Sequence, residues 1–576
     1  SKGMADDDPC KQFFVTLREA IGFDDGDGSG RNDRGCFVND DKDGNSLGNR
    51  AFHWLVITSF LLDVEYLFEE LPEIIKYQKV IVYYGSVEGN SMQAMRQWEQ
   101  VLGNSGKTVE FIRLVPSDPP YSATNPLPFK LPYGVHHSKF FLSGYEEEGK
   151  HMCRIGIHSA NLRRSDIERK TQGIYVQDFP AKAPKKQAAA AVNPYKRAKV
   201  DEDDDLRQFE DDLITYMESY RYYVRGQIWF SPSTTQSGGL TDRSHSILTL
   251  LRRYDFSCAY AVLVPSVPGY HQARDMPKFG YYKIHKAVKN ARSGRAGSNQ
   301  SSSGETETPK PIIFQVSSLG TIQNRWLIKL LAAIDSNCHR NDPSTYLPAG
   351  KSIPQGKTPP LETRMKLVWP TVEEVRTCVE GYAGGGAIPG TTEKLDKDFL
   401  LPLYHRWSNP DTNILGPLRT ARYAPHIKTF VQPGDGDEIH WVVLTSHNLS
   451  KPSLGEFQTD TKTNERRLMI QHWELGVFFS PETLTKMTSD NSPLRMIPFE
   501  EAGQCGIKDA ALVPLPYSLH PSRYDENEEA WATDRPASTP DAFGRVQVVE
   551  MRRNERGGMS NQGILRSTNP GDSSLF

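Results

Sequence analysis

The sequence predicts an α/β protein made of two pseudo-symmetric halves, each a mixed, mostly parallel sheet flanked by helices, with one active site at their interface. Three observations carry this prediction. The chain has 576 residues, which is more than one hydrophobic core usually serves. Apolar runs typical of buried strands alternate with helical patterns. A set of polar motifs occurs twice in the same order, once in each half.

The repeated motif is a His-x-Lys pair that is followed, about a hairpin's length later, by Ser-x-Asn-Leu. If each pair sits on a strand, its period-two alternation puts the His and the Lys on the same face. Matched positions in the same order indicate two halves of one shared site. These positions are His137, Lys139, Ser159 and Asn161 in the first copy, and His426, Lys428, Ser446 and Asn448 in the second.

Composition is that of a soluble globular protein, with 37% hydrophobic and 24% charged residues. No apolar run approaches the roughly 20 residues that span a bilayer, and the first residues lack the layout of a signal peptide, so we expect neither a membrane segment nor secretion. Seven scattered cysteines without a Cys-x-x-Cys pair argue against a zinc ribbon or a disulfide framework and favour a reducing compartment. The formal charge of −3 means that a polyanion would bind in a local groove.

The expected organisation is a polar, loose segment at 1–50, a first half at 51–253 and a second half at 254–576, with flexible insertions at about 181–205 and 293–310 and a loose tail at about 549–576. Two short runs permit other interpretations. The Asp/Gly run at 24–31 is similar to a calcium loop but lacks the acidic residue in the twelfth position. The basic run at 196–199 is a candidate nuclear-targeting signal.

The elements follow from apolar periodicity and from turn and cap residues. Helices are predicted at 60–68, 90–102, 206–223, 324–334 and 371–382. Strands are predicted at 79–84, 109–115, 153–158, 171–176, 258–264, 311–316, 440–445 and 468–479, and each His-x-Lys is expected on a strand. The last helix opens with Thr371 and Glu374, which suit a capping box.

Paired imidazoles, ammonium groups and amides suit chemistry at phosphorus. One imidazole can attack while the other moves protons. Lysines and asparagine amides offer donors to the non-bridging oxygens, and one ammonium about 4 Å from an anionic oxygen contributes about 4 kcal/mol at an effective dielectric near 20. No carboxylate cluster that would hold a metal stands next to the motifs, so we expect metal-free catalysis.

A purely structural interpretation explains one copy of the motifs more easily than two. A single His-x-Lys on a strand is common by chance, and Ser-x-Asn alone is compatible with turn chemistry. Both motifs repeating together favour a shared site. The histidines that flank the motifs are interpreted as structural: His136, His158 and His447.

The motifs also resemble a known superfamily. Paired His-x-Lys motifs resemble the phospholipase D superfamily, whose usual form has an Asp several residues after each Lys. Here Lys139 is followed by Phe-Phe-Leu-Ser-Gly and Lys428 by Thr-Phe-Val-Gln-Pro, so that Asp is absent twice. This departure, with further motifs in order from about Trp54 to Trp531, is similar to the tyrosyl-DNA phosphodiesterase family. The further motifs are Ser159-Ala-Asn161-Leu, Lys170-Thr-Gln172-Gly-Ile, Glu380-Gly-Tyr-Ala-Gly-Gly385, Thr445-Ser-His-Asn448-Leu-Ser-Lys451 and Trp473-Glu474-Leu-Gly-Val477.

The resemblance implies a metal-independent DNA-repair phosphodiesterase without a cofactor. It would hydrolyse the 3′-phosphotyrosyl bond of stalled topoisomerase-DNA adducts, and other 3′ blocking adducts, through a phosphohistidine intermediate, and leave a 3′-phosphate. By the resemblance His137 is the nucleophile, and His426 is the general acid and then the base; the repeat alone leaves open which histidine attacks. The other implied catalytic residues are Lys139, Lys428, Asn161 and Asn448, which grip the phosphate, and Gln172 and Glu474, which take the places of the missing Asp residues.

Substrate contacts are expected from an aromatic that stacks on a base, from hydroxyls that bind backbone phosphates, and from a Gly-rich loop on the peptide side. Each of these also has a purely structural interpretation, as a strand-closing aromatic or as ordinary loop packing. The candidates are Tyr133, Ser317, Ser318, Ser450, Gly385, Pro389 and Trp531.

The expected partners are single-stranded or 3′-end DNA that carries a tyrosyl peptide derived from a topoisomerase. The protein is expected to be a monomer in the nucleus, with no membrane partner. Two alternatives stay open: another nuclease or phospholipase of the same superfamily, and a catalytically inactive DNA-binding relative. The missing Asp residues weigh against the first, and the two intact motifs weigh against the second.

Overall fold

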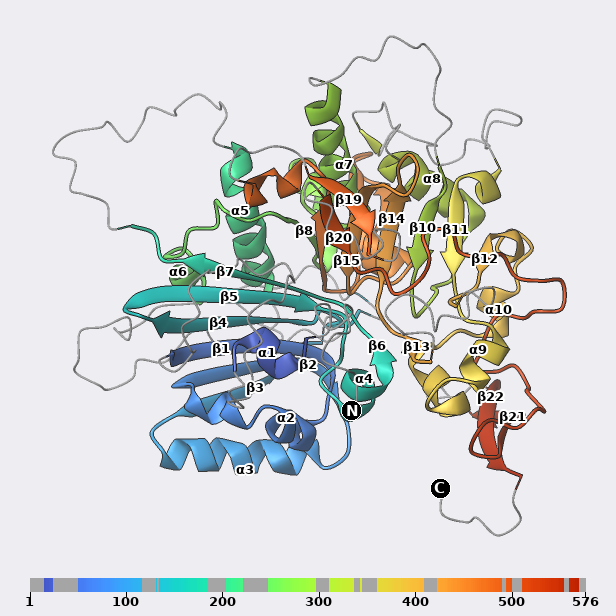
Figure 1. Ribbon diagram of the computed structural model, residues 1–576, viewed down its shortest axis with the longest axis horizontal. Helices are drawn as coiled ribbons and strands as arrows, with labels where there is room; N and C mark the ends of the chain where they lie inside the picture. The colour runs from blue at the N-terminus through green and yellow to red at the C-terminus, as the bar shows by residue number, and fades with distance from the viewer. Residues whose placement is uncertain are drawn as a thin grey trace.

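The computed structural model of the protein describes residues 15–23, 50–115, 131, 134–183, 204–220, 247–296, 310–335, 342–343, 360–408, 422–488, 494–499, 510–553 and 559–568. Several expectations lie outside these residues: Tyr133, the calcium-loop candidate at 24–31, the basic run at 196–199 and most of both predicted insertions. In the described part, two large mixed sheets lie side by side, one running from blue to teal and the other from green to orange (Figure 1).

The first sheet has six strands in the order β3-β2-β1-β4-β5-β7. Its strands are β1 (Ala51–Leu62), β2 (Lys79–Val87), β3 (Thr108–Arg113), β4 (Phe140–Glu147), β5 (Lys150–His158) and β7 (Ile174–Pro180). Helices α2 (Val64–Glu70) and α3 (Ser91–Asn104) lie on one side of this sheet, and α5 (Asp204–Ser219) lies on the other (Figure 1). Because both faces are covered, the central strands are nearly continuous apolar runs.

The second sheet has seven strands in the order β12-β11-β10-β14-β15-β18-β8. Its strands are β8 (Val262–Ser266), β10 (Ile312–Gln315), β11 (Met365–Val368), β12 (Tyr404–His405), β14 (Thr429–Pro433), β15 (Ile439–Thr445) and β18 (Glu474–Phe479). Helices α7 (Gly280–Ala296) and α8 (Asn324–Ile334) pack against each other beside it. The bounds of α8 are those predicted from its apolar spacing.

The two sheets share a topology. In each, a central strand pairs in parallel with the next strand of the chain and antiparallel with the strand that follows the His-x-Lys motif: β1 with β2 and β4, β10 with β11 and β14. The prediction of a mixed α/β fold is confirmed. Antiparallel pairs outnumber parallel ones, however, so "mostly parallel" is wrong. The reason is that β4–β5 and β14–β15 are hairpins, and short turns join only antiparallel neighbours.

The shorter elements connect and flank the sheets. The helices are α1 (Leu17–Ile21), α4 (Arg164–Arg169), α6 (Ile247–Leu251), α9 (Val372–Arg376), α10 (Thr392–Leu395) and α11 (Lys451–Leu454), with a 3-10 helix at Gly381–Ala387. The strands are β6 (Lys170–Thr171), β9 (Gly269–Gln272), β13 (Ala424–Pro425), β16 (Glu456–Thr459), β17 (Arg466–Ile470), β19 (Arg495–Pro498), β20 (Ala510–Val513), β21 (Arg545–Arg553) and β22 (Met559–Ser567).

Two predicted helices, 60–68 and 371–382, depart furthest from the structure. The run predicted as a helix at 60–68 is divided, because β1 continues to Leu62 and the Asp63 carboxylate accepts a bond from the Tyr66 amide and so begins α2. The predicted capping box of Thr371 and Glu374 is present, but α9 ends at Arg376, before the 3-10 helix.

The chain is ordered at two places where we expected loose segments. Near the N-terminus α1 buries Leu17 and Ile21, and Phe23 packs on Phe52 with ring centroids 5.1 Å apart. Near the C-terminus β21 and β22 form an antiparallel hairpin, in which the buried Gln547 amide donates to the Arg535 carbonyl at 2.7 Å. In both segments apolar side chains pack on the core, Leu17, Ile21 and Phe23 in the first and Leu565 in the second.

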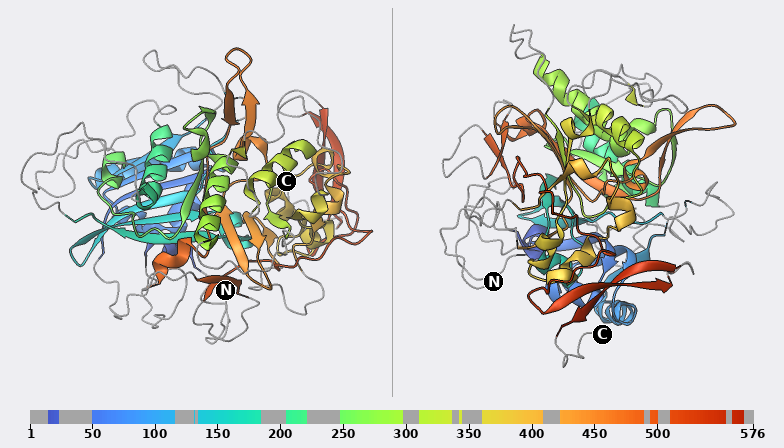
Figure 2. Two further views of the ribbon diagram at one scale, coloured as in Figure 1. Left: turned by 90° about the horizontal axis from the view of Figure 1, so that it is seen from above. Right: turned by 90° about the vertical axis from the view of Figure 1, so that its right-hand side faces the viewer.

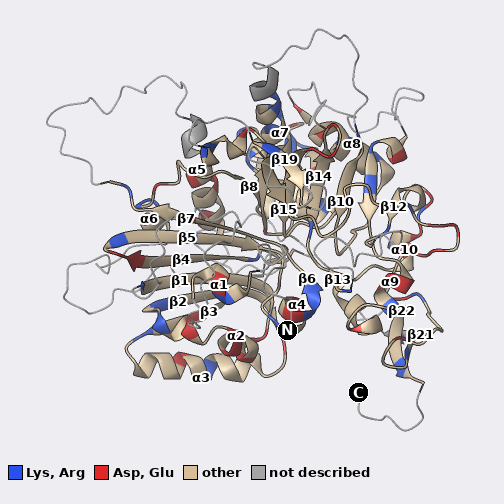
Figure 3. Cartoon of the chain, viewed as in Figure 1, with Lys and Arg blue, Asp and Glu red and all other residues tan. Residues whose placement is uncertain are grey.

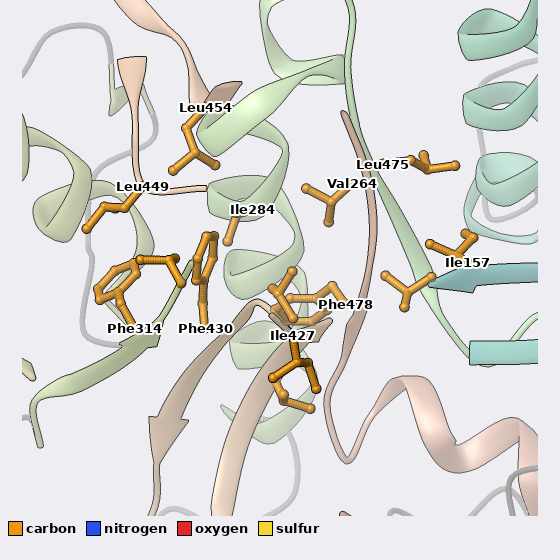
Figure 4. Packing of buried hydrophobic residues seen from close by; sticks show 14 of the residues in the cluster. Ile157, Val264, Ile284, Phe314, Ile427, Phe430, Leu449, Leu454, Leu475 and Phe478 are labelled. Carbon is orange, nitrogen blue, oxygen red and sulfur yellow. The ribbon is translucent and has the colours of Figure 1, made fainter. Parts of the chain in front are cut away.

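One hydrophobic cluster extends from the first sheet into the second. Ile157 of β5 lies near Leu475 and Val264 of the second sheet (Figure 4). Seen from above, α5 crosses the face of the first sheet (Figure 2), and it contacts β8 of the second sheet. None of the described helices is both long and apolar enough to cross a membrane.

Candidate active site

The two His-x-Lys motifs meet at the centre of the molecule, where each half pairs with the other half's backbone. The His137 amide donates to the Trp473 carbonyl at 3.0 Å, and the His426 amide donates to the Thr171 carbonyl at 3.1 Å. Strand β13 pairs in parallel with β6, and an isolated bridge joins His136 to Trp473 (Figure 1). We had expected each motif to lie on a strand, but neither does. The first motif ends immediately before β4 begins, and the second ends immediately before β14 begins.

The spacing of His-x-Lys has a local reason in the structure. The Lys139 ammonium donates to the carbonyl oxygen of His137 at 2.6 Å, and the Lys428 ammonium donates to the carbonyl oxygen of His426. Both lysine side chains are buried. Each lysine therefore folds back beside its own histidine, which agrees with the predicted common face.

His137 is oriented by a buried carboxylate from the other half. Its Nδ1 donates to Glu474 Oε2 at 2.9 Å, and the Ser446 hydroxyl donates to the same oxygen at 2.6 Å. The Leu475 amide in turn donates to Ser446 Oγ at 3.0 Å. With Nδ1 protonated, the lone pair of the neutral imidazole is on Nε2.

His426 is oriented in the same way by a neutral amide from the first half. Its Nδ1 lies 3.2 Å from Gln172 Oε1 and 3.1 Å from Gln172 Nε2. The Ser159 hydroxyl donates to Gln172 Oε1 at 2.7 Å, as Ser446 does to Glu474, and the Gly173 amide donates to Ser159 Oγ. The pseudo-symmetry is therefore broken in charge, because a carboxylate faces His137 and an amide faces His426.

A second acid, Asp166 of α4, lies on the His426 side. Its Oδ2 is 3.6 Å from His426 Nδ1 and accepts bonds from the backbone and side-chain amides of Asn161, at 3.1 and 2.7 Å. Arg163 donates to its Oδ1 at 2.8 Å. Burial would raise the pKa of Asp166, but His426 and Arg163 hold that pKa well below its usual range, so the carboxylate is ionised.

The two asparagines are held through their oxygens by backbone amides. Asn161 Oδ1 accepts from the Leu61 amide at 3.2 Å, and Asn448 Oδ1 accepts from the Ser318 amide at 3.0 Å. An amide side chain has two N–H donors. The carboxylate of Asp166 takes one donor of Asn161, so the other one and both donors of Asn448 can serve a bound anion.

Burial and mutual repulsion lower the pKa values of the basic groups. Burial lowers the pKa of His137 to about 4 and that of Lys139 to about 8, although Glu474 acts in the opposite direction on both. Burial and Lys428 hold the pKa of His426 well below its usual range, and burial and Lys139 do the same to the pKa of Lys428. These four groups interact across the interface of the halves, and a bound anion would raise all four pKa values.

Two of the three flanking histidines form hydrogen bonds to side chains of the protein core. His136 Nε2 lies 2.8 Å from the Tyr220 hydroxyl, and His447 Nε2 lies 2.9 Å from Ser266 Oγ. His136 and His447 are fully buried, and His158 is almost fully buried. Their burial agrees with the structural interpretation.

The predicted substrate-binding residues fall into two groups. Ser317 and Ser318 follow β10 and surround Asn448, and Ser450 caps α11 beside Gly320. Gly385 and Trp531 form one packed unit, because the indole donates to the Gly385 carbonyl at 3.1 Å. The indole of Trp531 is buried and packs under the 3-10 helix at Gly381–Ala387. Of the three peptide-side candidates Gly385, Pro389 and Trp531, only Pro389 is exposed.

Sequence reasoning assigned no role to Ser159, Ser446 or Asp166. The two serines belong to the repeated Ser-x-Asn-Leu, so the repeat contained a signal for them. Asp166 has no counterpart in the second copy, and the repeat could not indicate it. Charged residues of both signs are dispersed over the two halves (Figure 3), so no composition signal pointed to this carboxylate either.

The duplicated mixed α/β fold, with two His-x-Lys motifs at its centre, defines an enzyme of the phospholipase D type. The profile of the tyrosyl-DNA phosphodiesterase family matches residues 45–525. The chain therefore belongs to the tyrosyl-DNA phosphodiesterase family, whose members are DNA-repair phosphodiesterases, and the predicted enzyme class is confirmed.

Known proteins agree with this assignment. Tyrosyl-DNA phosphodiesterase 1 of Arabidopsis thaliana is 27% identical over 512 residues, which are 85% of this chain and 71% of that protein. A probable tyrosyl-DNA phosphodiesterase of Caenorhabditis elegans is 25% identical over 490 residues, 85% of this chain and 83% of the relative. The crystal structure of the yeast tyrosyl-DNA phosphodiesterase shares the fold, with a TM-score of 0.51 at 15% identity over 84% of this chain and 94% of that chain.

Proposed function

We propose that the protein hydrolyses the 3′-phosphotyrosyl bond of DNA, and other 3′ blocking adducts, through a phosphohistidine on His137. The observation that carries this proposal is the reciprocal orientation of the two imidazoles, each held at Nδ1 by a side chain from the opposite half. Both Nε2 atoms are thereby available for a phosphodiester bound between the halves. Lys139 and Lys428 supply the positive charge for its oxygens.

The broken symmetry supports His137 as the nucleophile. Attack by Nε2 on phosphorus makes the imidazole cationic, and the ionised Glu474, 2.9 Å from Nδ1, stabilises that charge. Burial alone would raise the pKa of Glu474, but His137 holds it well below its usual range. The neutral Gln172 beside His426 gives no comparable stabilisation.

The first step needs a proton on His426. As His137 Nε2 bonds to phosphorus, the bond to the tyrosine oxygen breaks, and that oxygen takes the proton from His426 Nε2. The free site keeps His426 neutral. The anionic phosphodiester raises the pKa of His426, as Asp166 already does from 3.6 Å. When substrate binds, His426 therefore takes up from solvent the proton that the first step consumes.

The second step reverses the role of His426. The imidazole, now neutral, takes a proton from water, the oxygen bonds to phosphorus and the bond to His137 breaks. The products are free His137, protonated His426 and DNA with a 3′-phosphate. Lys139, Lys428, Asn161 and Asn448 hold the phosphate oxygens through both steps.

We propose that the two parts of the substrate bind on opposite sides of the site. Single-stranded or 3′-end DNA would lie on the side of Ser317, Ser318 and Ser450. The topoisomerase-derived peptide would lie beside Gly381–Ala387. The 3-10 helix supports this placement, because a methyl group at Gly384 would lie 3.5 Å from Ala424 Cβ, just before His426. We propose that the enzyme acts as a monomer in the nucleus. Light scattering and localisation of the tagged chain test these two points.

The test is release of tyrosine from a 3′-phosphotyrosyl oligonucleotide in the presence of EDTA. We expect full activity in EDTA, and no adduct and no turnover with His137→Ala. With His426→Ala we expect slower formation of a protein-DNA adduct that then accumulates, because a phenolate, with a parent pKa of about 10, leaves without full protonation, whereas the attack of water needs the base. Loss of activity in EDTA would contradict the metal-free step, and an adduct formed by His137→Ala would contradict the nucleophile. Cleavage of phosphatidylcholine or of an unmodified plasmid in preference to this substrate would favour the superfamily alternative.

A further inference from the structure

Three side chains with metal-ligating atoms meet at the end of the first sheet that is remote from the motifs. They are His53 of β1, Glu146 of β4 and His151 of β5, and one ligand atom from each lies within 4.8 Å of the others. Glu146 and His151 are direct cross-strand partners in the β4–β5 hairpin. A bulge between Phe52 and Trp54 shifts the register of β1 at His53, and a bulge can re-aim a side chain in this way.

Two buried ring nitrogens of this cluster have no hydrogen-bond partner. They are His53 Nε2 and His151 Nδ1, and they face the same carboxylate oxygen, Glu146 Oε2, at 3.8 and 3.4 Å. These separations are too long for hydrogen bonds. In a tetrahedral zinc site with Zn–N bonds of about 2.0–2.1 Å, neighbouring ligand atoms lie about 3.4 Å apart. The two separations from Glu146 Oε2 therefore suit ligands around one ion, and the two histidine ligand atoms lie within 4.8 Å of each other.

We propose that His53, Glu146 and His151 bind a divalent transition ion of the zinc class. Two imidazoles and one carboxylate are a ligand set that zinc accepts, and cobalt and nickel bind the same ligands. Among the described residues, no lysine or arginine forms an ion pair with Glu146, so its charge is free to meet a cation. A fourth ligand can come from solvent, because the side chains of His53, Glu146 and His151 are 31%, 37% and 35% exposed.

The ion would be a structural clamp on three strands. It joins β1, β4 and β5 at one end, and the amide of Leu61, which positions Asn161, lies eight residues further along β1. At about 3.3 Å per residue this places the ion roughly 26 Å from the phosphate site. It touches none of the groups assigned to catalysis. The proposal is thus independent of the proposed function, and a chelator should remove the ion without stopping the reaction.

The test uses the full chain after treatment with a chelator and dialysis. Titration with Co²⁺ alone should give one equivalent with the visible absorption of a four-coordinate ion, and Zn²⁺ should displace it. His53→Gln and Glu146→Gln should each weaken Co²⁺ binding at least tenfold. His520→Gln is the matched control, because His520 is an exposed histidine beside a carboxylate, Asp437, at 3.3 Å, and this variant should bind like the wild type.

A second readout concerns stability. Zinc at 100 times its Kd should lower the unfolding constant of the wild type about 100-fold, seen as a higher Tm. The same zinc concentration should lower the unfolding constant of His53→Gln by about 11-fold or less and so raise its Tm less. Circular dichroism and cleavage of the tyrosyl substrate show that each variant is folded. Equal Co²⁺ affinity in the wild type and His53→Gln, or no saturable binding by the wild type at millimolar Co²⁺, would overturn the proposal.

Discussion

Replacing Glu474 by Gln tests the functional asymmetry of the two halves. The substitution keeps the shape of the side chain and removes the charge that lies 2.9 Å from His137 Nδ1. A hydrogen bond to a charged group contributes about 1.5–3 kcal/mol, and each 1.4 kcal/mol or so is tenfold in rate. Because the imidazole becomes cationic only as it attacks, we expect kcat/KM to fall about 10- to 150-fold while substrate affinity stays unchanged.

Rapid-quench measurement of the protein-DNA adduct separates this effect from the second step. Glu474→Gln should slow adduct formation. Ser446→Ala is the graded control, because it removes one bond of 2.6 Å to the carboxylate but keeps the charge, and a loss of about 2- to 10-fold is expected. A Glu474→Gln enzyme within twofold of the wild type, or one slowed only in adduct hydrolysis, would refute the assignment of His137.

Three further predictions concern the charges of the site. Because burial lowers the pKa of Lys139 to about 8, its ammonium is charged below that pH and neutral above it, so kcat/KM should fall as pH rises through about 8; a profile that stays flat to about pH 10 would contradict this. Binding of the oligonucleotide to the unreactive His137→Ala should take up about one proton near pH 7, measured by calorimetry in two buffers of different ionisation enthalpy, and equal heats would count against a neutral His426 in the free site. Asp166→Asn should slow release of tyrosine more than release of p-nitrophenol, which needs less help from an acid, and equal slowing would assign Asp166 a purely structural role.

The centre of the site could be predicted because each motif is local in sequence. Lys139 bonds to the carbonyl of the histidine two residues before it, so His-x-Lys is a complete local unit that sequence spacing describes. The repeat indicates that there are two such units. It does not indicate that each histidine receives its orienting side chain from the opposite half, as His137 does from Glu474.

The features of the fold and site that the sequence did not predict depend on contacts between residues far apart in sequence, or lie in segments whose composition suggested loops. Asp166 reaches His426 from 260 positions away and has no repeat partner. The bulge at His53 depends on the pairing of β1 with β4, which is a register and not a local pattern. The C-terminal hairpin mixes apolar and polar residues, and Gln547 anchors it through backbone carbonyls that no periodicity reveals.

Duplication alone would give two equivalent histidines and no direction to the reaction. The halves are alike in fold, in the lysines and in the serines that brace each orienting side chain. They differ where charge decides the chemistry: Glu474 favours a cationic His137, whereas Gln172 leaves the charge of His426 to the substrate and to Asp166. In the proposed mechanism the negative charge of the phosphodiester raises the pKa of His426, so this imidazole takes up a proton from solvent only when there is a bond to break. Without substrate, burial lowers the pKa of both imidazoles and so favours their neutral form, which is the form of His137 that the proposed attack needs.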